Sequence, residues 1–394
     1  MPRMNPTTPL PSLEKDTLPP VTTAVPSRPR LKSLDVFRGI TVLAMILVNN
    51  PGSWGKIYAP LKHAAWHGCT PTDLVFPFFL FIVGVSIAYA LSGAKQFPEQ
   101  HTATIVRIIR RGLTLFALGL FLALFPKFDF ETVRIPGVLQ RIGVVFIIAG
   151  IIFLKTERRT QILIAVFLLV GYWAVMMFAP VPGIGQSNLL PTTNLAAWLD
   201  NTLLPGHLWK STKVWDPEGI LSTLPAVVTA LCGVLTGQWL KKKDEPGNKI
   251  AWLMVWGVIC TCLGLIWDLH FPINKSLWTS SYVLYTAGLA MLGVGLCYWL
   301  IDVKGYHRFT TPFLVYGVNA ITVFFLSGII PRIMSMIKVD TAAGEVDSKT
   351  YLYESFYTPF LNPYNASLAW ALTWILFWMI ILWVMYRKNI IIKV

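Results

Sequence analysis

The sequence predicts an all-α polytopic membrane protein, a helical bundle of about ten transmembrane helices. Of its 394 residues, 55% are hydrophobic and only 13% are charged, a balance that is not typical of soluble domains. The apolar residues gather in ten stretches, each close to the roughly 20 residues that a membrane-crossing helix needs. Most of the 33 basic residues lie in alternate loops between these stretches, as the positive-inside rule describes for membrane proteins.

The ten stretches follow one another along most of the chain. Helices are the expected conformation, because a segment in lipid must satisfy its own backbone hydrogen bonds and these stretches are too long and too evenly apolar for barrel strands. We expect residues 32–394 to form one transmembrane domain. The predicted spans cover approximately residues 34–51, 72–94, 105–125, 136–154, 160–180, 219–240, 250–268, 278–301, 311–332 and 364–386.

Residues 1–31 differ in kind from the rest of the chain. They are rich in proline, threonine and serine, a composition that cannot bury a core and is typical of disorder. They also contain no apolar region followed by a small-residue cleavage site, so we expect no cleaved signal peptide. The sequence therefore predicts a disordered cytoplasmic tail before the first span.

The positions of the basic residues predict the orientation in the membrane. Both termini are expected on the cytoplasmic side, which an even number of spans requires. The net charge of +14 is then mainly a topology signal, with a further role in attracting membrane lipids that carry negative charge. We expect no nucleic-acid partner. The loops predicted to face outward are 52–71, 126–135, 181–218, 269–277 and 333–363.

The cysteines indicate neither a disulfide framework nor a metal site. Four of the five cysteines fall inside predicted spans, and none has the spacing of a zinc motif. No cluster of histidine, cysteine and carboxylate residues is evident in the sequence. We therefore expect no bound metal.

The first span carries polar residues at both of its ends. It opens with Asp35 and Arg38 and closes with Asn49 and Asn50. A charge at bilayer depth costs roughly 2.5–3.5 kcal/mol on insertion scales, so the charges that persist there usually face a cavity or a partner. Asp35 and Arg38 are three residues apart on a helix, which favours a mutual ion pair. Arg38 is also a candidate for binding a phosphate group.

The loop between the first two spans carries His63, His67 and Asp73 beside an apolar helix. Imidazole has the unperturbed pKa nearest neutrality, so a positioned histidine takes up and returns a proton within one turnover. We expect proton-transfer chemistry here, with His63 as general base or nucleophile and Asp73 as the group that orients it. Two other interpretations stay open: Asp73 caps the second helix, and the histidines are hydrogen-bonded at the interface without a catalytic role.

The fourth span begins with a second polar group, formed by Arg134, Gln140 and Arg141. Arg141 lies too deep in the span to reach the interface comfortably, so a partner or a phosphate is expected beside it. Guanidinium groups bind phosphate through two parallel hydrogen bonds. Gln140 lies between the two arginines. These residues, with Arg38, are the candidates for binding a ligand that carries phosphate.

The long outward loops carry aromatic residues and carboxylates, which suit a sugar or an amine. The same residue types also anchor proteins at the membrane interface without binding a ligand, and that interpretation stays open for each aromatic residue. The candidates for binding a substrate are Asn50, Trp54, Trp66, Asp216 and Glu218.

Five long segments carry a resemblance to a known family. They are SLDVFRGITVLAMILVNNPGSW, LKHAAWHGCTPTDLVFPFFLFIVGVSIA, VRIPGVLQRIGV, WDPEGILSTLPAVVTALCGVLTGQWL and INKSLWTSSYVLYTAG. From about Leu34 to its end, the chain closely resembles the heparan-alpha-glucosaminide N-acetyltransferase family. The resemblance implies an acetyltransferase that uses cytosolic acetyl-CoA and acetylates the amine of a terminal glucosamine, or a similar amino sugar, on the far side of the membrane.

The resemblance also implies roles for single residues. The family's active-site histidine corresponds to His63, with His67 the weaker candidate, and two further family positions correspond to Asn49 and Asp73. His63 would deprotonate the acceptor amine or carry the acetyl group, Asp73 would fix its tautomer, and Asn49 would donate to the developing oxyanion. A homodimer and a bacterial inner-membrane location are further implications.

Alternatives to this function remain at the sequence level. An amino-sugar transporter or permease would also have ten spans and buried polar residues, although no internal repeat links the two halves of the chain. An O-acetyltransferase acting on a sugar hydroxyl would need the same donor and a similar site. A purely structural membrane subunit would leave Arg141 and His63 without a role.

Overall fold

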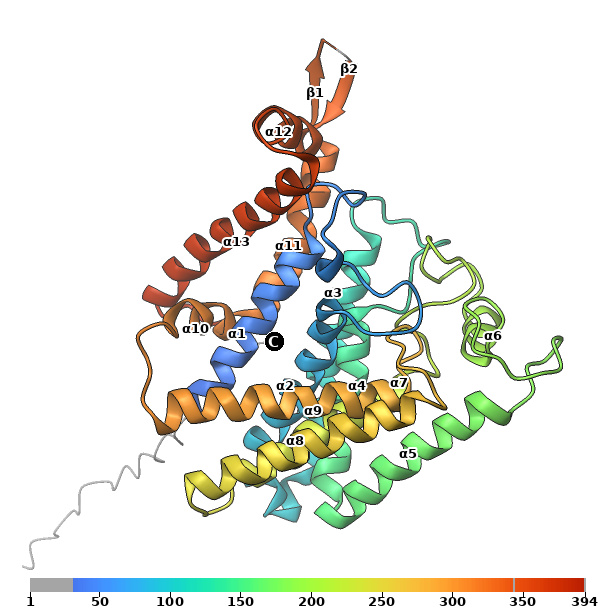
Figure 1. The fold of residues 1–394 in the computed structure, drawn as a ribbon, viewed down its shortest axis with the longest axis vertical. Helices are drawn as coiled ribbons and strands as arrows, with labels where there is room; N and C mark the ends of the chain where they lie inside the picture. The colour runs from blue at the N-terminus through green and yellow to red at the C-terminus, as the bar shows by residue number, and fades with distance from the viewer. Residues whose placement is uncertain (1–30, 343, 393–394) are drawn as a thin grey trace, which may run out of the picture. The chain divides into compact units, whose positions relative to one another are not determined.

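Helices make up most of the chain in the computed structural model (Figure 1), which describes residues 31–342 and 344–392. The predicted disordered tail lies, up to residue 30, outside the described residues. The long helices are α1 (Lys32–Asn49), α2 (Val75–Lys95), α3 (His101–Leu124), α4 (Val138–Lys155), α5 (Arg158–Phe178), α7 (Thr223–Leu240), α8 (Pro246–Asp268), α9 (Ser280–Cys297), α11 (Ala320–Met336) and α13 (Pro363–Arg387).

Shorter elements connect the long helices. A π-helical turn, η4 (Tyr298–Val303), continues α9, and β1 (Lys338–Thr341) pairs with β2 (Gly344–Asp347) in an antiparallel hairpin before α12. The other short helices are η1 (Ala59–Leu61), η2 (Pro71–Leu74), η3 (Pro98–Gln100), α6 (Leu195–Leu203), α10 (Thr311–Val318) and α12 (Ser348–Phe356).

The prediction of an all-α polytopic protein is confirmed, but fewer helices than ten have the apolar length of a span. Seven helices qualify among the described residues, and the bent pair α10 and α11 makes an eighth if it is one span. The other two predicted spans are helices α1 and α3. Charged side chains lower their apolar character: Lys32, Asp35 and Arg38 on α1, and Arg107, Arg110 and Arg111 on α3.

The stretch predicted as one span over residues 311–332 is broken. Helices α10 and α11 meet at Asn319 with a bend of 77°. The Asn319 side chain binds a distant part of the chain, because its Nδ2 donates to the carbonyl oxygen of Ile390 at 3.0 Å and its Oδ1 accepts from the backbone nitrogen of Ile392 at 3.0 Å. A side chain that hydrogen-bonds backbone groups offers an alternative to continued helix.

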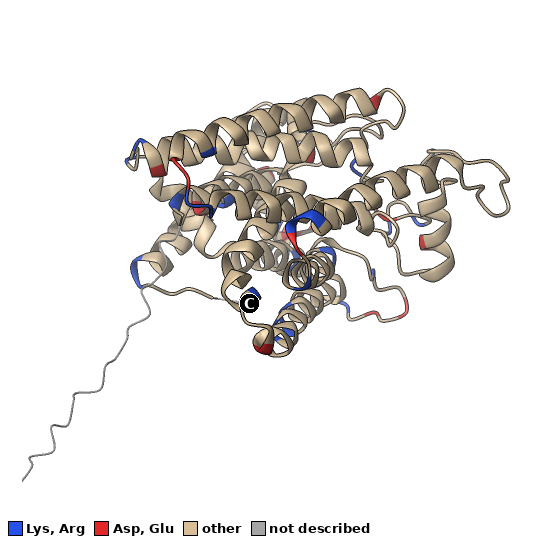
Figure 2. Ribbon diagram, turned by 90° about the horizontal axis from the view of Figure 1, so that it is seen from below, with Lys and Arg blue, Asp and Glu red and all other residues tan. Residues whose placement is uncertain are grey.

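Charged residues lie mainly at helix ends and in loops, while the long ribbons of the helices carry few of them (Figure 2). A bundle in lipid requires this distribution, because an exposed charge at bilayer depth is costly. The polar groups that do lie inside the bundle are therefore the ones to explain.

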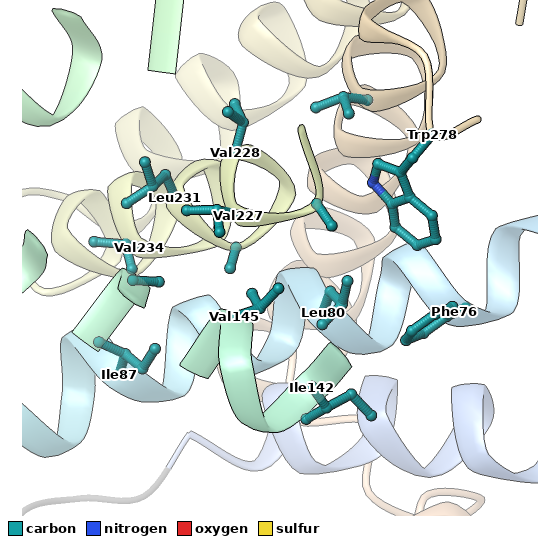
Figure 3. Packing of buried hydrophobic residues seen from close by; sticks show 14 of the residues in the cluster. Phe76, Leu80, Ile87, Ile142, Val145, Val227, Val228, Leu231, Val234 and Trp278 are labelled. Carbon is teal, nitrogen blue, oxygen red and sulfur yellow. The ribbon is translucent and has the colours of Figure 1, made fainter. Parts of the chain in front are cut away.

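Helices α2, α4 and α7 pack against one another, and Figure 3 shows their apolar side chains side by side, with Trp278 next to Phe76 at one end of the cluster. The backbones of α2 and α7 approach through glycines. A Cβ atom on Gly84 would lie 1.9 Å from the carbonyl oxygen of Ala230, and one on Gly233 would lie 2.0 Å from that of Phe81. Small residues allow this close approach of helices in membranes. The packing fixes the start of α2, where η2 precedes it.

Candidate active site

The loop between α1 and α2 is anchored to the start of α2. Thr70 and Asp73 form a capping box around the 3₁₀ turn η2, a reciprocal arrangement that satisfies the free backbone N–H groups of a helix start. The Thr70 hydroxyl donates to the carbonyl oxygen of Lys62 at 2.6 Å, and the Thr72 hydroxyl donates to that of Pro60 at 3.2 Å. These hydrogen bonds hold the segment around His63 against the helix start.

His63 and Asp73 form a short hydrogen bond, with 2.6 Å between His63 Nδ1 and Asp73 Oδ1. The second carboxylate oxygen, Oδ2, accepts hydrogen bonds from the backbone nitrogens of Ala64 and Thr70, both at 3.0 Å. The two interpretations of Asp73 therefore hold together, because one oxygen caps the helix while the other binds the imidazole. An ionised Asp73 assigns the proton to Nδ1 and leaves the lone pair on Nε2 of His63.

The two partners differ in exposure. The Asp73 side chain is 1% exposed, whereas that of His63 is 50% exposed. His63 lines a cavity of about 90 Å³ together with Asn49 and Glu218. The cavity extends along α1 from Asn49 to Thr41, and its other walls are Thr72, Lys275 and apolar residues of α2, α4 and α11. An imidazole with a buried carboxylate behind it and a cavity in front of it can take a proton from a bound group.

A larger cavity of about 820 Å³ adjoins the small one. The two share Met45, Asn49, Val138, Leu139 and Phe324 among their lining residues. Aromatic and basic side chains lie around the larger cavity. They are Trp54, Trp209, Trp370, Trp374, Lys127, Lys210, Arg332 and Lys349.

Lys275 is a further residue of the site, and sequence reasoning assigned it no role. Its Nζ lies 3.1 Å from Nδ1 and 3.3 Å from Nε2 of His63, and 3.9 Å from Asp73 Oδ1. Its loop is tied to the histidine loop, because the backbone nitrogen of Gly68 donates to the carbonyl oxygen of Ile273 at 2.7 Å. Lys275 lies in the segment INKSLW, which resembles the family, but nothing in that segment indicated that its loop contacts His63.

Burial changes the pKa of two groups near His63 that lie outside the membrane-spanning segments. It lowers the pKa of Lys275, against the opposing negative charges of Glu218 and Asp73. It raises the pKa of the Cys69 thiol to about 12, and the charge of Asp73 adds to this effect. A thiol that stays protonated is a poor nucleophile, so this shift does not favour Cys69 as a nucleophile.

Arg134 is paired with both carboxylates that were predicted to bind a substrate. Its guanidinium group contacts Asp216 at 2.6 and 2.8 Å and Glu218 at 2.5 Å. The Arg134 guanidinium also lies over the ring of Trp209, 5.7 Å from its centroid. Glu218 lines the small cavity and Arg134 the large one. This pairing neutralises part of the charge that each residue would offer to a ligand.

Arg141 is fully enclosed by protein and is 2% exposed. Its Nη2 donates to the carbonyl oxygen of Gly219 at 2.9 Å and to the hydroxyl of Ser222 at 2.5 Å, and its guanidinium lies over the ring of Trp278. Nε and Nη1 have no hydrogen-bond partner among the described residues. Its neighbour Gln140 lines the larger cavity, so the two residues face different surroundings.

Arg38 lies at the other end of α1 from Asn49. Eleven residues of helix separate them, a distance of about 16 Å along the axis. The predicted ion pair is present, with 3.0 Å between Arg38 Nη1 and Asp35 Oδ1, and Nη2 donates to the hydroxyl of Ser86 at 3.0 Å. The structure therefore does not bring Arg38 into contact with His63.

The remaining candidates fall into two places. Asn49 is exposed and lines both cavities, and Asn50 and Trp54 line the larger one. Trp66 instead packs edge-on against Trp215, and its Nε1 donates to the carbonyl oxygen of Leu189 at 2.8 Å. Trp66 thus joins the packing of the loops, as an anchoring residue would.

The described residues include no group of three or more histidine, cysteine or carboxylate side chains placed to hold a metal ion. The polar groups near His63 or around the cavity that it lines include the Asp73 carboxylate, the Lys275 amine, the Asn49 amide and the Glu218 carboxylate.

Fold and site together define a polytopic helical membrane protein with a histidine–carboxylate pair beside two adjoining cavities. The family model described as "Heparan-alpha-glucosaminide N-acetyltransferase, catalytic" matches residues 30–272, so the chain belongs to this family. The human protein named heparan-alpha-glucosaminide N-acetyltransferase is 33% identical over 350 residues, which cover 75% of this chain and 52% of the human protein. The mouse protein of that name is 31% identical over 349 residues, with 75% and 53% covered. The chain thus spans about half the length of these relatives.

Proposed function

We propose that this protein is a membrane acetyltransferase that moves an acetyl group from acetyl-CoA to the amine of an amino sugar. The observation that carries the proposal is the hydrogen bond between His63 and Asp73 at the edge of a cavity, in a chain that belongs to the family named above. The human and mouse relatives carry names that specify an N-acetyltransferase and a glucosaminide. A terminal glucosamine or a similar sugar is therefore the proposed acceptor.

His63 has the geometry of a general base. Asp73 holds Nδ1, so the lone pair of Nε2 is available to take a proton from the acceptor amine as the amine nitrogen attacks the thioester carbonyl carbon. The carbon–sulfur bond then breaks, and CoA leaves as a thiolate that takes up a proton. In a two-step route Nε2 itself attacks, and an acyl-imidazole carries the acetyl group to the amine. Asn49 is proposed to donate to the oxyanion in either route.

The donor is proposed to approach along α1. The small cavity runs from Asn49 toward Thr41 between apolar walls, and Arg38 lies one turn beyond Thr41, at the end of α1 that is predicted to be cytoplasmic. A thioester reaching His63 by this path would have its phosphates near Arg38. Gln140, Arg134 and Arg141 remain proposed donor contacts, although Arg134 and Arg141 already bind protein groups.

The acceptor is proposed to occupy the larger cavity. Its tryptophans offer flat apolar faces against which a sugar ring packs, and Asn50 and Trp54 lie on its wall. The loops that border it, over residues 126–135 and 333–363, are among those predicted to face outward. Donor and acceptor would then meet at Asn49, which lines both cavities.

The cellular setting is part of the proposal. We infer a multi-pass protein of a bacterial inner membrane with both termini in the cytoplasm, surrounded by lipids and forming a homodimer. Acetyl transfer across the membrane follows from this orientation, because the donor cavity and the acceptor cavity would then lead to opposite sides.

Acetyl transfer by the pure protein tests the proposal directly. The full chain in detergent is incubated with isotope-labelled acetyl-CoA and a panel of amino sugars, together with analogues that carry only hydroxyl groups, and products are identified by mass. Acetylated amine, lost in His63→Gln and retained in His67→Gln, is the expected result. Label on the protein in the absence of acceptor would indicate the two-step route.

Two outcomes would contradict the proposal. Acetylation of the hydroxyl analogues alone would make the protein an O-acetyltransferase. Absence of any CoA release, with uptake of an amino sugar into proteoliposomes that needs no CoA, would favour a transporter, a class in which broken helices such as α10 and α11 are frequent.

A further inference from the structure

The ammonium group of Lys275 lies beside the nitrogen at which the proposed reaction takes place. Its Nζ is 3.3 Å from Nε2 of His63, nearer than it is to the Asp73 carboxylate at 3.9 Å. The distances from Nζ to the two ring nitrogens are nearly equal, 3.1 and 3.3 Å, so the amine is not aligned with the lone pair of either nitrogen. Lys275 therefore leaves that lone pair available to a substrate.

Lys275 is held in place by its loop. Asn274 is completely buried, and its side-chain Oδ1 accepts a hydrogen bond from the backbone nitrogen of Leu277 at 2.9 Å. Its backbone carbonyl oxygen accepts one from the backbone nitrogen of Thr279 at 3.2 Å. The side chain of Lys275 is 20% exposed and lines the same small cavity as His63. A flexible surface lysine would have neither the burial nor the tether. The position is thus built into the fold.

We propose that Lys275 is a catalytic residue whose ammonium group binds the carbonyl oxygen of the acetyl group while that group is transferred at Nε2 of His63. The inference rests on the acyl-transfer function proposed above. A reacting carbonyl carbon lies about 3 Å from the attacking or proton-accepting atom, which brings its oxygen within reach of a donor that is 3.3 Å from the same atom.

The electrons balance without any change in the protonation of Lys275. When the nucleophile bonds to the carbonyl carbon, the π electrons of the carbonyl group move to its oxygen, and the ammonium stabilises that negative charge through a hydrogen bond. When the carbonyl re-forms, the carbon–sulfur bond breaks and its electron pair leaves on the CoA sulfur. Burial of Lys275 supports this role, because an ammonium with a lowered pKa is a stronger hydrogen-bond donor.

The charged groups around the imidazole are Asp73 from the start of α2, Lys275 from the loop after α8, and Glu218 across the cavity. Of these three only Lys275 is a cation, so it is the one that stabilises a negative charge developing beside the ring.

The test compares Lys275→Gln and Lys275→Arg with a matched control, Lys62→Gln, which removes an exposed charge from the residue before His63. In Lys275→Gln we expect kcat for acetyl transfer to fall by about 10²–10³-fold with little change in KM for acetyl-CoA. Lys275→Arg keeps the charge and is expected to retain part of the rate. Lys62→Gln is expected to behave as the wild type.

A second measurement separates a catalytic role from a structural one. The melting temperature in detergent is measured beside kcat for the wild type, Lys275→Gln and Lys62→Gln. We expect Lys275→Gln to lose kcat while its melting temperature stays close to that of the wild type. A merely structural lysine would lose kcat only in step with its stability.

The outcomes separate the two proposals. If the wild type transfers acetyl groups and Lys275→Gln matches it in kcat, or loses kcat only in step with its melting temperature, the role of Lys275 is overturned while the acetyltransferase stands. If the wild type shows no transfer at all, the proposed function fails. Should Lys275→Gln not fold, Lys275→Cys alkylated with 2-bromoethylamine restores an ammonium and is expected to regain activity over the unalkylated variant, and no gain would overturn the role.

Discussion

The two ends of α1 carry polar residues in different surroundings. At one end Arg38 is bound to Asp35 and to the hydroxyl of Ser86. At the other end Asn49 is exposed and lines both cavities, the smaller of them together with His63. The comparison shows that a polar residue in a predicted span need not face a cavity. The proposed site differs from the Arg38 end because polar side chains there line a cavity, while the buried carboxylate of Asp73 holds the imidazole from behind.

The strongest test of the comparison is Asp73→Asn. Asparagine has the same shape as aspartate but no negative charge, so it no longer fixes the proton of the imidazole on Nδ1. We therefore expect kcat to fall by about 10³-fold. The matched control is Asp347→Asn, which alters an aspartate that caps α12. If both variants lose activity and melt early, the Asp73 effect is only one of capping.

Asn49→Ala is expected to have the next largest effect. Loss of one oxyanion donor lowers kcat by about 10²-fold or somewhat less where a second donor such as Lys275 remains. Asn50→Ala is the comparison, because Asn50 lines only the larger cavity. This substitution should raise KM for the acceptor and leave kcat unchanged. Steady-state kinetics with both substrates varied distinguish the two, and equal effects on KM would remove Asn49 from the chemistry.

Arg38→Gln tests the satisfied end of α1. It removes the guanidinium group that lies 3.0 Å from Asp35 and should lower the melting temperature in detergent by about 5 °C. If donor phosphates also meet Arg38, KM for acetyl-CoA rises while kcat is retained, as expected for lost uniform binding. Arg38→Lys keeps the charge but not the planar fork and should be intermediate. An unchanged KM would confine Arg38 to a structural role.

The smallest expected effect concerns Asp200, in α6 outside the predicted spans. Burial raises the pKa of Asp200 to about 6 from an ordinary value of 3.8, a shift that the charge of Asp216 supports and that hydrogen bonds from the backbone oppose. Because the folded state holds this proton more tightly, stability is fully present below about pH 4 and falls as the pH rises to about 6. In Asp200→Asn the change in melting temperature between about pH 4 and pH 6 should be smaller by a few degrees. An identical pH dependence in the variant would assign it to other groups.

The sequence was sufficient for the fold class and for part of the site. The apolar stretches predicted helix at all ten positions, although only seven helices of the described residues, or eight spans with the bent pair, are long and apolar enough to cross a membrane. The pairing of His63 with Asp73 was also predictable, because both residues lie in one short segment whose proline and threonine indicate a helix start. Their geometry is local, and local geometry is what a sequence encodes most directly.

Contacts between distant segments were beyond the sequence. Lys275 is 212 residues from His63, and only the packing of the loop after α8 against the histidine loop brings them together. The pairing of Arg134 with Asp216 and Glu218 joins segments more than 80 residues apart and converts three predicted ligand-binding residues into one ion-pair cluster. The break at Asn319 was missed because an asparagine within an apolar stretch does not show which backbone groups its amide will bind.

The hydrogen bonds between Asn319 and residues 390–392 bear on where a label can be attached to the protein. These two hydrogen bonds join residues 390–392 to the bend between α10 and α11. A purification tag or fluorescent fusion placed just after residue 392 would therefore disturb the backbone groups that bind Asn319. A label attached ahead of α1 leaves these hydrogen bonds intact and is the better choice for reconstitution.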